Sequence, residues 1–308
     1  MAKDRLHIRK NVLLRNYTTF RIGGRARYFF IAKTRKDLVL AVEFAKDKKL
    51  PFFLLGGGSN VLIPEEGFGG LVVKIQNSKF GIQNSNIFSE AGVSLGNLVN
   101  AAADAGMAGL EWAAGIPGTL GGAIYGNAGW PSNDKNMSSV IESVDVLEVW
   151  PEFKIKEYKL KDCRFKYRDS AFKHKPGLVI LSAKLKLRKG DKDNIKKEIS
   201  NILKKRREKI PFGFSAGSVF KNPKDHFAAK LGEENKFSSS SYTAARMIEE
   251  CGLKGKTIGG AKISEKHANF IVNFKKAKEK DVKKLIILAK KEVKKKFNIS
   301  LEEEIVVF

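Results

Sequence analysis

Hydrophobic residues in the first part of the chain occur as short apolar runs and as helix-spaced stretches. The apolar run at residues 27–32 is typical of a strand. Thr34, with Asp37 three positions later, predicts a capping box that opens a helix. The buried face of that helix is formed by Leu38, Ala41, Val42 and Ala45. Pro51 ends the helix, and the apolar run 52–55 predicts a short buried strand that leads directly into a glycine loop.

The remaining chain continues this mixture of strands and helices. Strands are predicted at 71–75, 144–149 and 178–181, and helices at 95–105 and 193–207. Near the end, Val282, Leu285, Ile286, Ala289 and Val293 recur at helical spacing among lysines, which indicates an amphipathic helix with a solvated lysine face. The pattern predicts an α+β architecture. We expect three domains, at residues 1–75 (completed by 297–308), 76–200 and 201–296.

The net charge of +25 on 308 residues is the main departure from ordinary globular composition. Such a charge attracts anions and favours nonspecific contact with nucleic acid. Much of it lies in the lysine-rich stretch 275–296, whose only neighbouring aromatics are Phe274 and Phe297. Because nucleic-acid sites usually interleave basic residues with stacking aromatics, a solvated helix face is favoured over a nucleic-acid site.

Several protein classes lack support in the sequence. The first residues carry no apolar segment of the kind a secretory signal needs, and no apolar run is long enough to span a bilayer. Cys163 and Cys251 are far apart and form no CxxC or Cys/His cluster, and the four histidines show no metal-ligand spacing. We therefore expect a cytoplasmic protein without a metal, without a membrane partner and without a required nucleic acid, with a monomer favoured.

Two glycine loops are the first candidates for chemistry. The loop at 56–60 follows a predicted strand and could form an anion-binding nest, although a plain tight turn explains it equally well. The loop at 115–129 contains six glycines, whose conformational cost close approach to a pyrophosphate would offset; a glycine-packed strand corner is the alternative. Neither loop is the Rossmann GxGxxG fingerprint. A P-loop ending in Gly255-Lys256-Thr257 is excluded because it would need glycine where Glu250 stands.

Seven segments together resemble one family. They are Thr18-Thr19-Phe20-Arg21-Ile22-Gly23-Gly24, 56–60, 115–123, Tyr167-Arg168-Asp169-Ser170-Ala171-Phe172, Gly217-Ser218-Val219-Phe220-Lys221-Asn222-Pro223, 252–255 and 258–273. Their order and spacing resemble the UDP-N-acetylenolpyruvoylglucosamine reductases, over about residues 14–306. The resemblance implies an FAD-binding two-subdomain fold of the vanillyl-alcohol oxidase (PCMH) type and a C-terminal α+β substrate-binding domain. The first half alone would also fit another FAD oxidoreductase of this fold acting on a different sugar or alcohol.

The family reaction implies roles for three residues. NADPH reduces FAD, and hydride then passes to the enolpyruvyl group of UDP-N-acetylglucosamine enolpyruvate, giving UDP-N-acetylmuramate for peptidoglycan synthesis. Arg168 matches the arginine that holds the substrate carboxylate and the developing charge, and Ser218 matches the proton donor. Glu304 matches the glutamate that assists the intermediate; it is chosen among three adjacent glutamates by its position before Ile305.

The same resemblance implies two sets of binding residues. Those for FAD are Arg21, Gly56, Gly57, Gly58, Ser59, Asn60, Gly115, Ile116, Pro117, Gly118, Thr119, Gly121, Gly122, Ala123 and Asn127. Those for the phosphates and sugar of the substrate are Lys209, Lys221, Asn222, Lys262, Lys266 and His267. Because lysines are abundant here, each of these lysines could equally be a solvated surface residue.

Two stretches depart from the family pattern. Trp130-Pro131-Ser132-Asn133-Asp134 replaces a turn in which glycine is usual, and the stretch 224–243, with its serine run 238–241, is longer than in many relatives. No counterpart of a substrate-covering tyrosine loop is found, so the shorter form of the family is favoured.

Overall fold

The predicted strand–helix–strand unit forms in the computed structural model, which describes residues 6–129, 135–223 and 243–307. It consists of β2 (Arg25–Ala32), α1 (Arg35–Asp47) and β3 (Phe52–Leu55). The capping box at the start of α1 is confirmed, because the Thr34 hydroxyl accepts from the Asp37 N–H at 3.0 Å and the Asp37 carboxylate accepts from the Thr34 N–H at 2.9 Å. Such a cap stabilises a helix by about 0.5–2 kcal/mol.

A four-stranded sheet of order β1-β2-β5-β3 brings three strand ends to one edge. It is completed by β1 (Arg9–Leu13) and β5 (Phe68–Ile75), and β5 pairs in parallel with both β2 and β3. Since the three strands run in parallel, their carboxyl ends meet at the same edge, where ligands bind in open α/β sheets. Lys33, Gly56 and Gln76 follow these three ends directly.

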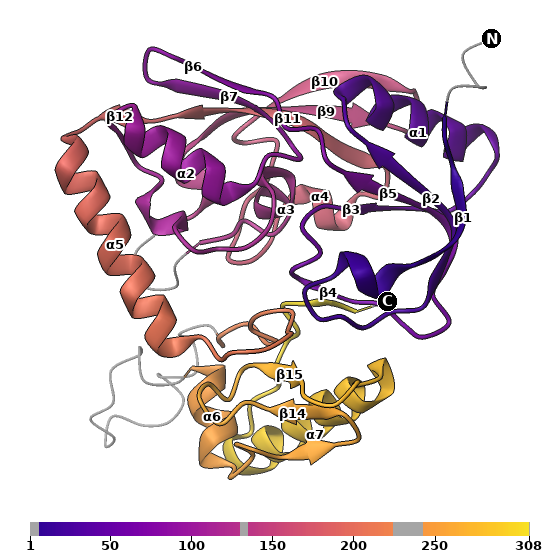
Figure 1. The fold of residues 1–308 in the computed structure, drawn as a ribbon, viewed down its shortest axis with the longest axis vertical. Coiled ribbons are helices and arrows are strands. Elements are labelled where there is room, and N and C mark those ends of the chain that lie inside the picture. Colours follow the sequence, from indigo (N-terminus) through magenta and orange to yellow (C-terminus); the bar gives the residue numbers. More distant parts are fainter. Residues whose placement is uncertain (1–5, 130–134, 224–242, 308) are drawn as a thin grey trace. The chain divides into compact units, whose positions relative to one another are not determined.

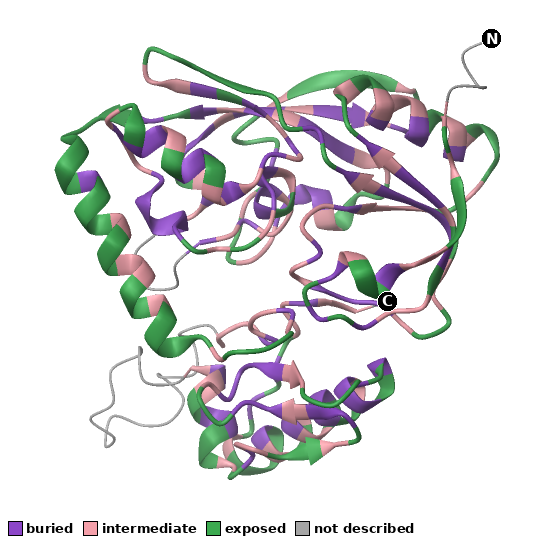
Figure 2. Ribbon diagram, in the orientation of Figure 1, coloured by how far each residue is buried: buried purple, intermediate pink, exposed green. Residues whose placement is uncertain are grey.

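A second, antiparallel sheet has the order β10-β9-β11-β7-β6 (Figure 1). Its strands are β6 (Phe80–Gln83), β7 (Asn86–Glu90), β9 (Ile141–Glu148), β10 (Lys154–Lys159) and β11 (Leu178–Lys186). The central strands β9 and β11 are buried at most positions, whereas the edge strands β6 and β10 are exposed (Figure 2). Edge strands with solvated faces are the usual limit of such a sheet.

Both faces of this second sheet contribute to a core. On one face it packs with α2 (Leu95–Asp104) and α3 (Leu120–Tyr125), around Trp112, Leu98 and Ile124. On the other, residues of β9 and β11 join α1 and the parallel sheet in a second apolar cluster.

Smaller elements are β8 (Met107–Ala108), β12 (Arg188–Lys189), α4 (Ala171–His174) and the 3-10 turns Glu111–Ala113 and Met137–Ser139. Helix α5 (Lys192–Lys209) follows β12.

The C-terminal part of the chain forms a separate apolar core. A three-stranded sheet of order β13-β14-β15 (Thr257–Ile258, Ala261–Ile263, Ile271–Asn273) packs with α6 (Ala244–Glu250) and α7 (Glu279–Phe297). The predicted amphipathic helix is confirmed as α7, and its five predicted apolar residues are all buried. β4 (Val61–Leu62) pairs in parallel with β16 (Val306–Val307), and a 3-10 turn occupies Leu14–Tyr17.

The chain divides into two compact units. The first contains Ala26–Gly57 and Phe68–Arg206 together with residues up to Val12, and the second contains Leu13–Arg25, Gly58–Gly67 and Arg207 onward. The predicted division into three domains remains a prediction, and its boundary near residue 200 falls inside the continuous helix α5. Among the described residues, no helix is both long and apolar enough to cross a bilayer.

Candidate active site

In the first unit, the two glycine loops lie against each other. A Cβ on Gly56 would lie 2.6 Å from the Thr119 Oγ1, and a Cβ on Gly57 would lie 2.6 Å from the Gly118 Cα. At Gly57 the backbone of the second loop leaves no room for a side chain, and at Gly56 the Thr119 side chain fills the space, before any ligand is considered. The sequence predicted close approach to a ligand, and the structure shows close approach of one loop to the other.

The second loop is fixed at the start of two helices. Gly118 has φ +117°, which favours glycine, and its carbonyl accepts from the Leu95 N–H at 3.0 Å at the start of α2. Thr119 is the N-cap of α3 and forms an isolated β-bridge with Ser94, the N-cap of α2. Gly121 donates to the Ala91 carbonyl at 2.8 Å. The loop is thus held rigidly beside two helix N-termini, which attract anions.

A cavity of about 520 Å³ opens at this place, and we call it the Lys74 cavity. Its polar lining residues are Lys33, Lys74, Gln76, Ser78, Ser94, Asn97 and Thr119. They come from the carboxyl ends of β2 and β5, from the start of α2 and from the second glycine loop. None of the described residues that line it is Asp or Glu, so its donors and cations suit an anion.

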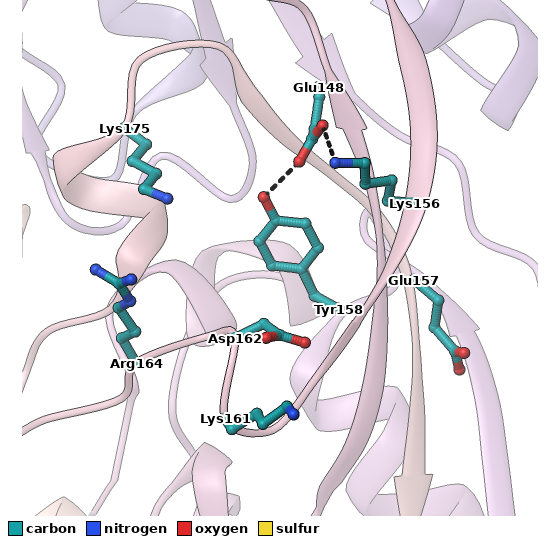
Figure 3. Close-up of a pocket in the computed structure, with 8 residues that line it drawn as sticks. All are labelled: Glu148, Lys156, Glu157, Tyr158, Lys161, Asp162, Arg164 and Lys175. Atoms are coloured by element: carbon teal, nitrogen blue, oxygen red, sulfur yellow. Dashed lines mark hydrogen bonds and ion pairs between the residues drawn. The ribbon is translucent and has the colours of Figure 1, made fainter.

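A second cavity, of about 440 Å³, differs in its charge (Figure 3). Its lining includes Glu148, Glu157 and Asp162 as well as four basic residues. The Glu148 carboxylate accepts from the Tyr158 hydroxyl at 2.7 Å and pairs with Lys156 at 2.8 Å. Because this lining compensates its own charges, it offers an anion much less than the Lys74 cavity does.

Arg168 is held in a strained backbone conformation in the first unit. Its φ is +52°, and its guanidinium donates to the Gly129 carbonyl at 2.8 Å and stacks on Tyr167 at 5.2 Å. The neighbouring backbone is fixed by buried Asn127, whose amide donates to the Lys166 carbonyl at 2.9 Å. The Asn127 side chain also accepts from the Ser138 N–H at 3.0 Å, so it supports this segment.

Arg206 is a second cation near Arg168, and no motif in the sequence pointed to it. It donates to the Trp112 carbonyl at 3.4 Å, and its Cδ would lie 3.0 Å from a Cβ on Gly115. Burial, with a further contribution from the charge of Arg168, lowers the pKa of Arg206. Two guanidiniums that repel each other beside the second glycine loop favour an anion there. Of the other predicted loop residues, Ile116 is half-buried against the core and Ala123 is buried.

In the second unit, the rest of the first glycine loop joins the C-terminal strand. Gly58 has φ +68° and its carbonyl accepts from the Thr19 N–H at 3.0 Å. The Asn60 side chain donates to the Glu304 carbonyl at 3.1 Å, and the Asn60 carbonyl accepts from the Val306 N–H at 2.9 Å. Arg21 has φ +55° and lies over the Phe214 ring at 5.6 Å. Ser59 continues the loop between Gly58 and Asn60.

Ser218 is half-buried and its backbone is fixed from two sides. It bridges Phe270, and the next residue, Val219, donates to the Asn269 carbonyl at 2.8 Å and accepts from the Glu304 N–H at 2.8 Å. Buried Asn269 also forms both side-chain hydrogen bonds to the Phe220 backbone, at 2.9 and 2.8 Å. Main-chain hydrogen bonds therefore bring the segments that carry Ser218 and Glu304 side by side.

The three adjacent glutamates differ in their surroundings. Glu302 is largely exposed and pairs with Lys221 at 3.2 Å, and Glu303 pairs with Lys290 at 2.5 Å. Glu304 is half-buried, and its backbone contacts both Val219 and Asn60. Glu304 therefore lies beside the Ser218 segment through its main chain, and its choice among the three glutamates remains a prediction.

The predicted substrate residues fall into two groups. His267 stacks edge-on with Phe270 at 4.9 Å, and its pKa is lowered mainly by burial, with a contribution from the charge of Lys209. Lys266 donates to the Arg207 carbonyl at 2.7 Å, close to Lys209 in the chain. In the second group the two lysines form salt bridges, Lys221 with Glu302 and Lys262 with Glu265 at 2.5 Å, and the Asn222 side chain accepts from the Ala244 N–H at 3.2 Å.

In the part of the chain that the structure describes, no group of three or more His, Cys, Asp or Glu residues could hold a metal ion. Cys163 and Cys251 are free thiols. The departures at Trp130–Asp134 and within 224–243, including the serine run 238–241 and His226, lie outside the described residues, apart from Thr243, which caps α6.

Comparisons with known proteins agree across the chain. Residues 210–308 match the family "UDP-N-acetylenolpyruvoylglucosamine reductase, C-terminal domain", and residues 26–149 match "FAD binding domain". The chain is 41% identical over 296 residues to the UDP-N-acetylenolpyruvoylglucosamine reductase of Caldicellulosiruptor bescii, covering 95% of this chain and 88% of that protein. It is 37% identical over 304 residues to that of Clostridium novyi, covering 98% and 92%. The crystal structure of the Thermus caldophilus reductase superposes with a TM-score of 0.79 at 32% identity, over 98% of this chain and 99% of that one.

Proposed function

Because the chain belongs to the UDP-N-acetylenolpyruvoylglucosamine reductase family, a group of FAD-dependent oxidoreductases, we propose that it reduces UDP-N-acetylglucosamine enolpyruvate to UDP-N-acetylmuramate with NADPH. The reaction supplies peptidoglycan synthesis, and we place it in the cytoplasm. The observation that carries the proposal is the pairing of the Ser218 and Glu304 segments in the second unit. NADPH, as the hydride source, enters the proposal through the family alone.

The residues of the first unit fit the cofactor. The Lys74 cavity supplies cations and hydroxyl donors without a carboxylate, as the diphosphate of FAD requires, and it adjoins both glycine loops. FAD bound there would supply the hydride-transfer chemistry that links NADPH to the terminal carbon of the enolpyruvyl group. In the first unit, Gly56, Gly57 and Gly115–Ala123 would hold it, with Asn127 supporting the adjoining backbone. Arg21, Gly58, Ser59 and Asn60, which belong to the second unit, enter the proposed FAD site through the family resemblance.

Ser218 is proposed as the proton donor to the carbon next to the substrate carboxylate. Hydride addition leaves enolate-like charge at this carbon, and a positioned hydroxyl can donate the proton that completes the reduction. Hydrogen bonds at Val219 and Phe220 fix the main chain next to Ser218, so the hydroxyl is carried on a fixed segment of backbone. Glu304, whose N–H donates to the Val219 carbonyl, is proposed to orient the intermediate and to assist proton transfer.

Arg168 is proposed to bind the substrate carboxylate and to stabilise its developing charge. A guanidinium is suited to this task because it is always charged and presents a planar set of donors. The hydrogen bond to Gly129 and the contact with Tyr167 orient it. Lys209, Lys266 and His267 are proposed to contact the phosphates and sugar, and the salt-bridged Lys221 and Lys262 would have to exchange their carboxylate partners for substrate.

The role of Ser218 can be tested by measuring the two half-reactions, reduction of the flavin and reduction of the substrate, one at a time. In Ser218→Ala, NADPH should still bleach the visible flavin band at the wild-type rate, because no proton donor to the substrate is needed. Addition of the enolpyruvyl UDP-sugar should then restore the band roughly a hundredfold or more slowly than in the wild type. Ser200→Ala, a change at an exposed position of α5, is the matched control and should leave both rates unchanged. Wild-type recovery in Ser218→Ala would remove Ser218 from the proton-donor role.

A further inference from the structure

Lys74 is a half-buried cation beside the first glycine loop. It lies near the end of β5, in the parallel sheet of the first unit, and is half-buried between apolar neighbours of that strand. Its ammonium group donates to the carbonyl of Gly56, the first residue of the first glycine loop. Burial lowers the pKa of Lys74 below its usual range. Keeping a charge at such a position is costly unless something compensates it.

The protein side of the Lys74 cavity does not supply that compensation. No described residue that lines the cavity is acidic, and a second cation, Lys33, lines it as well. A carbonyl satisfies one of the three ammonium donors of Lys74 but brings no negative charge. A cavity of about 520 Å³ lies within the usual range for small-molecule sites. The chemistry of the lining therefore calls for an anionic occupant.

The other lining groups narrow the class of anion. Ser78, Ser94 and Thr119 contribute hydroxyls, and Ser94 and Asn97 stand at the first turn of α2. Several hydroxyl donors around two ammonium groups at the carboxyl edge of parallel strands match the usual environment of phosphate groups. A single carboxylate would leave most of these donors without a partner. A diphosphate, with its larger charge and more numerous acceptors, would use them.

We propose that Lys74, with Lys33 beside it, binds the diphosphate of FAD. The inference rests on the proposed placement of FAD at the two glycine loops and deepens it by naming the charged groups that hold the cofactor. Lys74 then has two tasks, because the same ammonium group holds the Gly56 carbonyl. Binding of the diphosphate and the ordered geometry of the first glycine loop are thereby coupled through one side chain.

Ligands that share parts of FAD test this assignment. Flavin-depleted protein carrying Lys74→Met should bind FAD and ADP roughly ten- to a hundredfold more weakly than the wild type, since a charge-assisted hydrogen bond is lost. Its affinity for riboflavin, which lacks phosphate, should stay within about twofold. Lys33→Met lies at an exposed position and should fold normally; it should reduce FAD and ADP affinity in the same selective way, though less. Flavin fluorescence reports FAD and riboflavin, and competition with FAD reports ADP.

Matched variants distinguish the possible failures. Lys156→Met, at the second cavity, where Lys156 pairs with Glu148, should leave the affinities for FAD, ADP and riboflavin unchanged. Gly57→Ala, whose Cβ would lie 2.6 Å from the Gly118 Cα, tests the placement of FAD itself and should weaken FAD and riboflavin together. Wild-type FAD affinity in both lysine variants would overturn the role of Lys74 while leaving the glycine-loop placement intact. Unchanged FAD affinity in Gly57→Ala would overturn the placement. Equal losses for FAD and riboflavin in Lys74→Met would assign Lys74 to loop geometry alone.

Discussion

Asn269 is expected to be the residue on which the position of Ser218 depends most. It is 4% exposed, and its side chain accepts from the Phe220 N–H at 2.9 Å and donates to the Phe220 carbonyl at 2.8 Å. Its own carbonyl accepts from the Val219 N–H at 2.8 Å. Replacement by alanine would keep this main-chain bond but remove both side-chain bonds, and Phe220 is itself only 2% exposed.

The cost can be worked out from these contacts. Asn269→Ala leaves one buried N–H and one buried C=O without their partner, and each such loss costs about 1–3 kcal/mol. Because a water molecule can partly replace the lost side chain, we expect the free energy of unfolding to fall by about 2–4 kcal/mol. The segment 218–220 should also shift slightly. Since a displacement of about 1 Å near reacting groups can cost roughly a hundredfold in rate, the step that protonates the substrate should slow at least tenfold.

Two measurements check this expectation. Urea unfolding followed by fluorescence gives the change in stability, and rapid mixing of reduced enzyme with the enolpyruvyl UDP-sugar gives the rate of the second half-reaction. Asn201→Ala, at an exposed position of α5, is the matched control and should change the free energy of unfolding by no more than about 0.5 kcal/mol. If Asn269→Ala unfolds at the wild-type urea concentration and turns over normally, the two side-chain hydrogen bonds of Asn269 contribute neither to stability nor to the position of Ser218.

A second variant separates the two bonds. Asn269→Asp keeps an acceptor for the Phe220 N–H, but only a protonated carboxyl can donate to the Phe220 carbonyl. Burial raises the pKa of such a carboxyl in the folded state. A carboxyl whose pKa is raised in the folded state stabilises the fold at low pH, and this contribution is lost as pH rises through the folded-state pKa. The variant should therefore be closest to the wild type in acid and most destabilised at neutral pH.

Three further expectations follow from titratable groups. Burial, together with the hydrogen bond to Glu148, raises the pKa of Tyr158 to about 12. The phenol therefore stabilises the fold below about pH 10 and loses that effect as pH rises toward 12. Glu148→Gln should lower the pH at which half of the phenolate absorbance appears. Burial raises the pKa of Cys163 to about 12, so a thiol reagent at neutral pH should modify the half-buried Cys251 first and reach Cys163 only after unfolding. Burial lowers the pKa of His267, so its contribution to stability is present above about pH 6.5 and is lost as pH falls. In His267→Gln, the urea concentration at half-unfolding should therefore vary less between pH 7 and pH 5 than it does in the wild type.

The elements that the sequence predicts well are those with a local physical cause. The start of α1 follows from a capping box four residues long, and the buried face of α7 follows from apolar spacing within one helix. β3 was predicted with its observed bounds because an apolar run between Pro51 and a glycine loop leaves little alternative. The pairing of strands is different. The parallel contact of β16 with β4 joins residues more than 240 positions apart, and nothing local in either segment specifies it.

The residues of the candidate site also divide into those that the sequence could identify and those that only the structure could. Motif residues such as Ser218 could be named because they stand inside distinctive segments. Lys74 and Arg206 could not, since each is one of 58 basic residues and acquires its meaning only from burial and neighbours. Likewise, three adjacent glutamates look alike in sequence, and the salt bridges of Glu302 and Glu303 become visible only when the strands are paired.

Backbone strain connects several of these residues. Nine described non-glycine residues have positive φ, and three of them, Arg21, Asn127 and Arg168, belong to the predicted site. A left-handed conformation costs an ordinary residue about 1–2 kcal/mol, so it persists only where surrounding contacts enforce it. At Arg168 those contacts are the Lys173 ammonium, which donates to its carbonyl at 2.8 Å, and Gly129, which binds its guanidinium. An arginine that only needed to remain in solvent would relax, whereas one that must present its guanidinium in a single direction gains from being held.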